Sequence, residues 1–235
     1  IGFLAKKYNI DEIFIAIPSS EGQTIRRILK SAQGLRLKFK IVPRTLEIVQ
    51  GRVQLYQLRE LRITDLLGRA IIKSEQSVFR KEFKDKKILV TGAAGSIGSE
   101  LCRQLMQFSP KKLVALDWSE NGLFELNAEF AKKKLSPFEC SLGSVQDINR
   151  LRYVVGRLCP HFIFHTAAFK HVPLTQENPL EAIKNNIFGT LNITKVAREF
   201  EVQKFIYISS DKAADPVSIM GATKFVGEQI INTAN

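Results

Sequence analysis

The sequence has only three cysteines, Cys102, Cys140 and Cys159, and none of them forms a C-x-x-C pair. Disulfide frameworks and structural zinc sites need paired cysteines, so neither is expected, and a reducing cytosol is the expected environment. The chain also lacks an apolar run of about 18 residues, the length of a membrane-crossing helix. Its first residues lack the basic flank and apolar centre of a secretory signal. We therefore expect these 235 residues to be soluble.

Histidine is scarce as well, with His161, His165 and His171 as the only examples. His161 and His165 fall on one predicted strand, about 13 Å apart along its axis, which is too far for a shared zinc ion. We expect structural roles for them and no metal site. The sequence contains neither a G-x-S-x-G element nor a P-loop, so hydrolase and kinase functions have no support.

Positive charge is concentrated in the first part of the chain. Residues 1–87 hold 19 Lys and Arg against 9 Asp and Glu, whereas residues 88–235 hold 16 against 14. A basic region of this kind could contact nucleic acid or anionic lipid, or it could be a solvated face without a partner. The aromatic and glycine residues of RNA-binding modules are missing from it, so no nucleic-acid partner is expected.

The chain divides into three predicted segments. Residues 1–57 contain two predicted strands, 12–17 and 38–43, and a helix over 21–32, which indicates a small partial α/β unit at the end of an upstream domain. Residues 58–86 are predicted to be a linker, and the basic stretch 50–86 has no single period and room for one or two short helices. Residues 87–235 form the main predicted domain.

From residue 87 onward, apolar strands alternate with helical stretches. The predicted strands are KKILVTG, KLVALD, the weaker PFECSLG, FIFHTAA and KFIYISS, and the predicted helices follow Ser96, Asn121, Val145, Asn178 and Ser218. Alternating βα units predict a doubly wound parallel sheet with right-handed crossovers. The expected fold class is therefore α/β, a Rossmann fold preceded by the small partial unit.

Three glycines, Gly92, Gly95 and Gly98, follow the first of these strands and open a helix. In a dinucleotide-binding turn the first permits the tight bend, the second lets the backbone approach a pyrophosphate, and the third lets the helix pack on the strand. Ser96 and Ile97 lie between them and are candidate cofactor contacts. The alternative is a tight strand-to-helix turn without a ligand.

The second strand ends in Asp117, 19 residues after Gly98. A carboxylate at this place accepts hydrogen bonds from the adenosine ribose and opposes a 2′-phosphate, and Trp118 adds no positive charge. NAD is therefore the expected cofactor, with NADP as the alternative. Asp117 could also serve as the cap of the following helix.

The spacing T-G-x-x-G-x-x-G and the segments HTAAFKHVPLTQENPLEAIKNNIFGT and YISSDKAADPVSIMGATK resemble a known family. They look like the capsular-polysaccharide type of UDP-N-acetylglucosamine 4,6-dehydratases, within the extended short-chain dehydrogenase/reductase superfamily. Residues 12–69 resemble the α/β unit that precedes the dehydratase domain in long members. The resemblance covers essentially the whole chain.

The resemblance implies catalytic residues at the end of strand KFIYISS. Asp211 would act as the acid, Lys212 as the base for the sugar C5 proton, and Ser210 would hydrogen-bond the substrate at O4. Met220 and Lys224 follow with the Y-x-x-x-K spacing of the superfamily, and Lys224 would hold the nicotinamide ribose. A thioether cannot exchange a proton, so Met220 indicates either a variant mechanism, which some long members share, or loss of activity. The Asp211–Lys212 pair alone could also be a surface ion pair.

The resemblance also implies further contacts. Lys170 would lie near both nicotinamide and substrate, and Asn186 matches the helix asparagine of the superfamily and would contact substrate. Each could instead be an ordinary solvated residue or a helix cap. The candidate cofactor contacts that remain are Ser144, Val145, Thr166, Ala167 and Ala168. Ser144 stands where relatives have an aspartate beside adenine, and Thr166 stands where many have alanine.

The sequence therefore predicts a nucleotide-sugar 4,6-dehydratase that acts on a UDP-sugar, in surface polysaccharide, capsule or lipopolysaccharide biosynthesis. The alternatives are a nucleotide-sugar 4-epimerase, a catalytically silent NAD-binding module and a basic nucleic-acid-binding module. By resemblance we expect a homo-oligomer at the cytoplasmic side of the inner membrane, anchored through a preceding region. The chain is expected to be a fragment that ends before the substrate lobe and is inactive alone.

Overall fold

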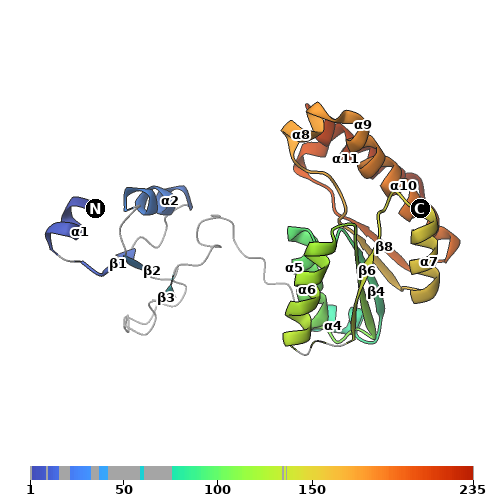
Figure 1. Ribbon diagram of the computed structural model, residues 1–235, viewed down its shortest axis with the longest axis horizontal. Helices are drawn as coiled ribbons and strands as arrows, with labels where there is room; N and C mark the ends of the chain where they lie inside the picture. Colours follow the sequence, from blue (N-terminus) through green and yellow to red (C-terminus); the bar gives the residue numbers. More distant parts are fainter. Residues whose placement is uncertain are drawn as a thin grey trace. The chain divides into compact units, whose positions relative to one another are not determined.

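The structure is a computed structural model, and it describes residues 2–8, 10–15, 22–32, 37–41, 59–60, 76–133, 135 and 137–234. The chain divides into two compact units, Ile1–Ser74 and Glu75–Asn235 (Figure 1). Several predicted segments lie outside the described residues, namely the strand ends 16–17 and 42–43, the first residue of the helix over 21–32, and positions 50–58 and 61–75 of the connector. Within the described part, no helix is both long and apolar enough to cross a membrane.

The first unit is a small α/β arrangement around a three-stranded sheet. Its described elements are α1 (Gly2–Lys7), β1 (Glu12–Ile15), α2 (Gly22–Ser31), β2 (Lys38–Ile41) and β3 (Arg59–Glu60). Strands β1 and β2 are parallel and β3 is antiparallel to β2. Ile15 is buried, and Ile28, Leu29 and Phe39 pack against it. Strand β3 lies within the predicted linker 58–86, and it belongs to this sheet.

The second unit contains a five-stranded parallel sheet in the order β6-β5-β4-β7-β8. The strands are β4 (Lys87–Thr91), β5 (Lys112–Asp117), β6 (Phe138–Leu142), β7 (Phe162–His165) and β8 (Lys204–Tyr207). Strands β4, β5 and β7 are almost continuously apolar because both faces of a parallel sheet are covered by helices. The predicted doubly wound α/β fold is confirmed.

Helices cover both faces of this sheet (Figure 1). The described helices are α4 (Gln76–Phe83), α5 (Ser96–Met106), α6 (Glu120–Lys132), α7 (Ile148–Leu158), α8 (Val172–Glu177), α9 (Pro179–Ala182), the π-helix η3 (Ile183–Phe188), α10 (Gly189–Glu199), the 3₁₀-helix η4 (Asp211–Ala213) and α11 (Ile219–Ala234). Ile88 and Val90 face α4, α5 and α6, whereas Leu89 faces α7 and α10. Because successive strand residues point to opposite faces, one short strand joins two cores.

Helix α4 packs into the second unit, although the sequence assigns its residues to the linker 58–86. Phe83 is 9% exposed, and its ring centroid lies 5.2 Å from that of Phe162. Phe79, Phe108 and Phe164 complete an aromatic cluster with ring centroids about 6 Å apart. The second unit therefore includes residues that precede its first strand.

The strand order reverses next to β4, and this reversal creates the site. The chain moves from β4 to β5 and β6 on one side, then crosses to β7 and β8 on the other. The loops after β4 and β7 therefore leave the carboxyl edge of the sheet in different directions. Ligands of open α/β sheets bind in the crevice between such loops.

Candidate functional site

The turn after β4 can be formed only by glycine at two of its positions. Gly92 has φ +70°, and a Cβ there would lie 2.4 Å from the backbone nitrogen of Ala167. A Cβ on Gly98 would lie 2.2 Å from the carbonyl oxygen of Gly92. Gly92 therefore lets the turn touch the loop after β7, and Gly98 lets α5 start directly behind the turn.

Helix α5 begins at this turn with free backbone donors. Its N-cap is Gly95, which has no side chain to accept a hydrogen bond from the first turn. The N–H groups of the first turn have no acceptor inside a helix, and the helix dipole adds positive potential there. Gly95, Ser96 and Ile97 are exposed and line a pocket in front of the helix. This arrangement fits a phosphate or pyrophosphate group.

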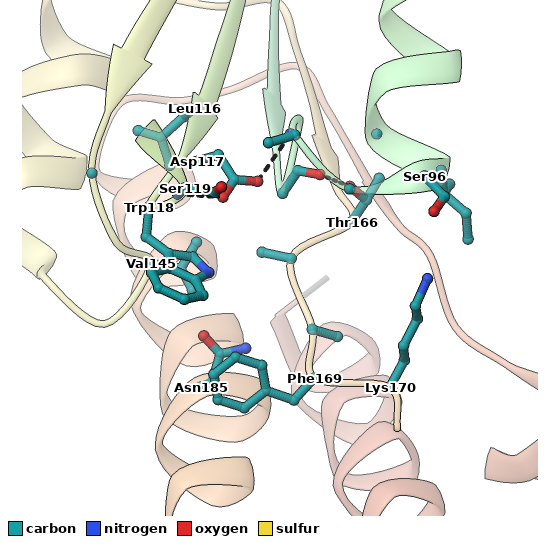
Figure 2. A pocket seen from close by; sticks show the side chains of 18 residues that line it. Ser96, Leu116, Asp117, Trp118, Ser119, Val145, Thr166, Phe169, Lys170 and Asn185 are labelled. Carbon is teal, nitrogen blue, oxygen red and sulfur yellow. Dashed lines mark hydrogen bonds between the residues drawn. The ribbon is translucent and has the colours of Figure 1, made fainter. Parts of the chain in front are cut away.

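Asp117 forms a second wall of the pocket, at the end of β5 (Figure 2). It is 7% exposed, and its carboxylate accepts hydrogen bonds from Ala94 N at 3.0 Å and Ser119 N at 2.9 Å. The cap of α6 is Ser119, which accepts a hydrogen bond from Gly122 N, so Asp117 is not the helix cap that the sequence allowed as an alternative. Asp117 instead presents a fixed acceptor beside the glycine turn.

These walls enclose a pocket of about 250 Å³ (Figure 2). It is lined by Gly92, Ala94, Gly95, Ser96, Ile97, Gly98, Leu116, Asp117, Trp118, Ser119, Gly143, Val145, Thr166, Ala167, Ala168, Phe169, Lys170 and Asn185. Of the cofactor contacts predicted from the sequence, only Ser144 and Lys224 do not line it. Ser144 accepts a hydrogen bond from Gln146 N. Trp118, Phe169 and Asn185 are lining residues that the sequence did not identify as contacts.

Thr166 joins the end of β7 to the glycine turn. Its hydroxyl donates to the carbonyl oxygens of Thr91 at 2.7 Å and Gly92 at 3.1 Å, and its backbone nitrogen donates to Thr91 O. An alanine could make only the backbone contact. The threonine hydroxyl therefore adds hydrogen bonds between the loop after β7 and the glycine turn.

The π-helix η3 positions two adjacent asparagines. Asn186 is 1% exposed; its Oδ1 accepts from Phe169 N at 2.8 Å, and its Nδ2 donates to Phe169 O and to Thr223 Oγ1, each at 3.0 Å. The amide of Asn186, predicted to contact substrate, thus holds the loop after β7 and joins it to α11. Asn185 lines the pocket. A wide π-turn often marks a functional site, but the sequence gives no signal for it.

A buried histidine lies behind the glycine turn. His165 has no exposed surface; Nδ1 lies 2.6 Å from Thr91 Oγ1 and Nε2 lies 3.0 Å from Thr190 Oγ1. Because the Thr190 hydroxyl donates to Asn186 O, it accepts from Nε2–H, so Nδ1 accepts from Thr91. Burial, and then the charge of Lys224, lowers the pKa of His165 to about 3. The ring is therefore neutral and structural.

No metal centre is formed by the described residues, in which no three His, Cys, Asp or Glu side chains are grouped suitably. His161 lies at the opposite edge of the sheet from the pocket, where its Nδ1 accepts a hydrogen bond from Lys87 N. His171 is exposed before α8.

Ser210, Asp211 and Lys212 lie at the same carboxyl edge of the sheet as the pocket. Strand β8 pairs with β7, and Ile208 N donates to His165 O, which brings the two strand ends side by side. Ser210 Oγ donates to Asp211 Oδ1 and accepts from Lys212 N. The side chains of Asp211 and Lys212 are 89% and 54% exposed, with Lys212 Nζ 3.8 Å from Asp211 Oδ1.

Next to this group, the hydroxyl of Ser209 is buried and has no hydrogen-bond partner in the described part of the chain. A buried polar atom without a partner is uncommon and marks a place where a ligand or water can bind. The three side chains of the Ser-Asp-Lys group follow Ser209 in the sequence, are accessible, and lie outside the wall of the pocket itself.

Helix α11 places Met220 and Lys224 beneath the Ser-Asp-Lys group. Met220 is 3% exposed and Lys224 is 6% exposed. Lys224 Nζ donates to Ile208 O at 2.7 Å and lies 4.6 Å from the ring centroid of Tyr207. Burial lowers the pKa of Lys224 to about 8. A Cβ on Gly221 would lie 2.5 Å from Lys212 O, so the helix packs directly on the Lys212 backbone.

Comparisons with known proteins agree with this geometry. The sequence profile of a family described as "Polysaccharide biosynthesis protein" matches residues 88–235. The capsular polysaccharide biosynthesis protein CapD of Staphylococcus aureus is 39% identical over 99% of this chain and 39% of its own length. A UDP-N-acetylglucosamine 4,6-dehydratase (inverting) of Campylobacter jejuni is 36% identical over 65% of this chain and 45% of its own length.

A solved structure shares the fold of the second unit. The X-ray structure of Pen from Bacillus thuringiensis is 35% identical, with a TM-score of 0.61, and the match covers 65% of this chain and 46% of that one. The chain thus spans less than half the length of the curated relatives and of the solved structure that it matches.

Proposed function

Because the chain belongs to the polysaccharide biosynthesis protein family, we propose that it is the cofactor-binding part of an NAD-dependent nucleotide-sugar 4,6-dehydratase. The proposed substrate is UDP-N-acetylglucosamine, and the product is the 4-keto-6-deoxy sugar used in surface polysaccharide. The observation that carries the proposal is the shared location of two features. The glycine-turn pocket and the Ser210-Asp211-Lys212 group lie at one carboxyl edge of the sheet.

The pocket suits the pyrophosphate and adenosine parts of a dinucleotide. The free N–H groups at the start of α5 suit the pyrophosphate, and the carboxylate of Asp117 suits the hydroxyls of a ribose. A 2′-phosphate would face this carboxylate, which supports NAD over NADP. Lys170 lines the pocket and is exposed, so its ammonium group can reach a phosphate or a substrate oxygen.

The bound nicotinamide would supply reversible hydride transfer, first from C4 of the sugar and then back to C6. Ser210 would hold O4 through its hydroxyl. Lys212 would take the C5 proton once C4 is a ketone, and Asp211 would give a proton to the C6 hydroxyl so that it leaves as water. C5 would take up a proton again as the hydride returns to C6. Both side chains are accessible, so the bound sugar would shield them from solvent during the reaction.

Lys224 would hold the nicotinamide ribose from beneath the strand end. Its ammonium group is fixed by Ile208 O and by the face of Tyr207, which keeps it next to the Ser-Asp-Lys group. Met220 cannot accept a proton, so the O4 proton needs another acceptor, and the buried thioether instead packs α11.

The relatives are more than twice as long as the matched segment, and the activity proposed belongs to the whole protein. We propose further that the whole protein is a homo-oligomer at the cytoplasmic side of the inner membrane, anchored through another part of its chain. The 235 residues alone would bind NAD but turn over little or no substrate.

The test is to incubate the whole protein with UDP-N-acetylglucosamine and NAD and to identify the product by mass spectrometry and NMR. A dehydratase product has lost one water, and NAD is recovered unchanged. An isomer of unchanged mass with inverted C4 would instead identify a 4-epimerase. Bound NAD without any product from the whole protein would identify a silent NAD-binding module.

Two substitutions test the assigned roles. Asp211→Asn and Lys212→Met should each lower kcat by about 10²-fold or more, because each removes a proton-transfer group. Matched controls are Asp215→Asn, an exposed residue of the same loop, and Lys195→Met, an exposed residue of α10. Full activity in Asp211→Asn would refute the assignment of the acid.

A further inference from the structure

Trp118 is the only tryptophan of the chain, and its side chain is unusually open for a residue beside a pocket. It is 67% exposed, and it lines both the glycine-turn pocket and a neighbouring apolar hollow of about 470 Å³. Large aromatic side chains are mostly buried in proteins, and exposed ones beside a cavity commonly contact a ligand. The two pockets share Trp118, Ala168, Phe169 and Lys170 as lining residues.

The backbone on both sides of Trp118 is fixed. Asp117 ends β5 and accepts hydrogen bonds from Ala94 N and Ser119 N. Ser119 then caps α6. The exposed indole therefore projects from a backbone that is held on both sides.

The pocket wall near Trp118 is mostly apolar. Val145 and Gly143 follow β6, and Val145 is 4% exposed. Figure 2 shows the indole of Trp118 on the same side of the pocket as Val145 and Asn185, away from Ser96. The Asn185 amide is held by Asn186 Oδ1 at 3.0 Å. A planar ring with polar edges matches this space.

The position of Trp118 relative to the other pocket walls indicates which base of a dinucleotide would lie next to it. A pyrophosphate at the start of α5 and a ribose at Asp117 place the attached base beyond Asp117, where residue 118 follows. That base belongs to the adenosine half of a dinucleotide, because Lys170 and the Ser-Asp-Lys group lie toward the other end.

We propose that Trp118 stacks on the adenine ring of the bound dinucleotide and closes the adenosine end of the pocket. This inference rests on the proposed binding of NAD. It assigns to Trp118 a binding role that depends on the ring face and not on charge. The role is separable from catalysis at the Ser-Asp-Lys group.

The single tryptophan makes the test direct. In the ¹⁵N-labelled chain, Trp118 gives the one indole N–H resonance, which can be followed during titration with AMP, NMN or UMP. AMP should shift this resonance saturably and quench the tryptophan fluorescence in parallel. NMN and UMP at equal concentration should leave the resonance in place. A shift with UMP and none with AMP would overturn the proposal and indicate a substrate nucleotide at this position.

Substitution provides a second measurement. Trp118→Ala should raise the Kd for AMP about five- to tenfold in calorimetry, because ring stacking is lost. Trp118→Phe should retain most of the affinity. The control is Phe124→Ala, since Phe124 is 73% exposed on α6 and does not line the pocket.

The two hypotheses fail in different ways. If calorimetry shows NAD binding to the 235-residue chain while the indole resonance and the Trp118→Ala affinity stay unchanged, stacking is refuted and the cofactor assignment stands. If the whole protein binds no NAD by the same method, the proposed function itself is refuted.

Discussion

His165 and Lys224 are two basic side chains buried close together behind the proposed active site. A second positive charge there would be costly, because burial removes the water that stabilises it. His165 therefore stays neutral, with both ring nitrogens bonded to threonine hydroxyls. Lys224 instead keeps a carbonyl acceptor and an aromatic face, which suit an ammonium group.

The neutral state of His165 predicts a pH dependence of stability. The pKa of His165 is about 3 in the folded chain against an ordinary value of 6.5, so the unfolded state binds the extra proton first as pH falls. Stability from this residue is therefore complete above pH 6.5 and is lost between pH 6.5 and pH 3. At about pH 5 the loss should be about 2 kcal/mol relative to about pH 7.5.

The measurement is the free energy of unfolding in urea at these two pH values. His165→Gln should show a smaller loss between them, by about 2 kcal/mol. His171→Gln, at an exposed position, should keep the original pH dependence. An unchanged loss in His165→Gln would show that the acid sensitivity comes from other groups.

At the scale of elements, the glycines of the turn from β4 to α5 have different roles, one in folding and one in binding. Gly98 is needed for packing, since any Cβ there meets the Gly92 carbonyl. Gly95 has φ −71°, a conformation open to alanine, and a Cβ there would lie 3.3 Å from Gly92 O. Because Gly95 lines the pocket, an added methyl group would narrow the space proposed for the pyrophosphate.

We therefore expect Gly95→Ala and Gly98→Ala to behave differently. Gly95→Ala should change the free energy of unfolding by less than about 1 kcal/mol but raise the Kd for NAD at least about tenfold. Gly98→Ala should lower the free energy of unfolding by about 2 kcal/mol or more, since backbone atoms must move. Thermal unfolding and calorimetry measure the two effects, and equal loss of stability in both variants would contradict the distinction.

The elements that follow a simple period were predictable, and those set by tertiary contact were not. The five strands of the sheet and the glycine turn fall where alternation and spacing place them. Asn185 was missed because a regular helix would not aim two adjacent residues at one site, and only the π-turn does so. The sequence places helix α4 in a linker because its residues are basic. The aromatic partners of its phenylalanines are brought together only by the fold.

At the scale of the whole molecule, the aromatic cluster defines where the second unit begins. The predicted boundary at residue 87 would remove Phe79 and Phe83, whose rings contact Phe108, Phe162 and Phe164. It would also remove the ion pair between Glu82 and Lys204. The division into compact units places the boundary between Ser74 and Glu75.

We expect a protein of residues 75–235 to fold with the NAD affinity of the 235-residue chain, because every pocket residue lies within it. A protein of residues 87–235 should unfold at a lower temperature. Phe83→Ala should lower the free energy of unfolding by about 3 kcal/mol, whereas Val78→Ala, at a position 56% exposed, should change it by less than about 0.5 kcal/mol. Equal melting temperatures for the two shortened proteins would contradict this role of α4.

The wide turn of η3 also changes the direction in which side chains point before and after it. Each residue of an α-helix advances the side-chain direction by about 100°, so one additional residue in a turn rotates everything on one side of it by that angle. Residues 179–182 and 189–199 therefore belong to one continuous helix, and the side chains of its two halves are rotated relative to each other. The same backbone irregularity directs Asn186 inward and Asn185 toward the pocket. An insertion or deletion in this helix would rotate these side chains away from their partners, whereas a substitution on its outer face would leave their directions unchanged.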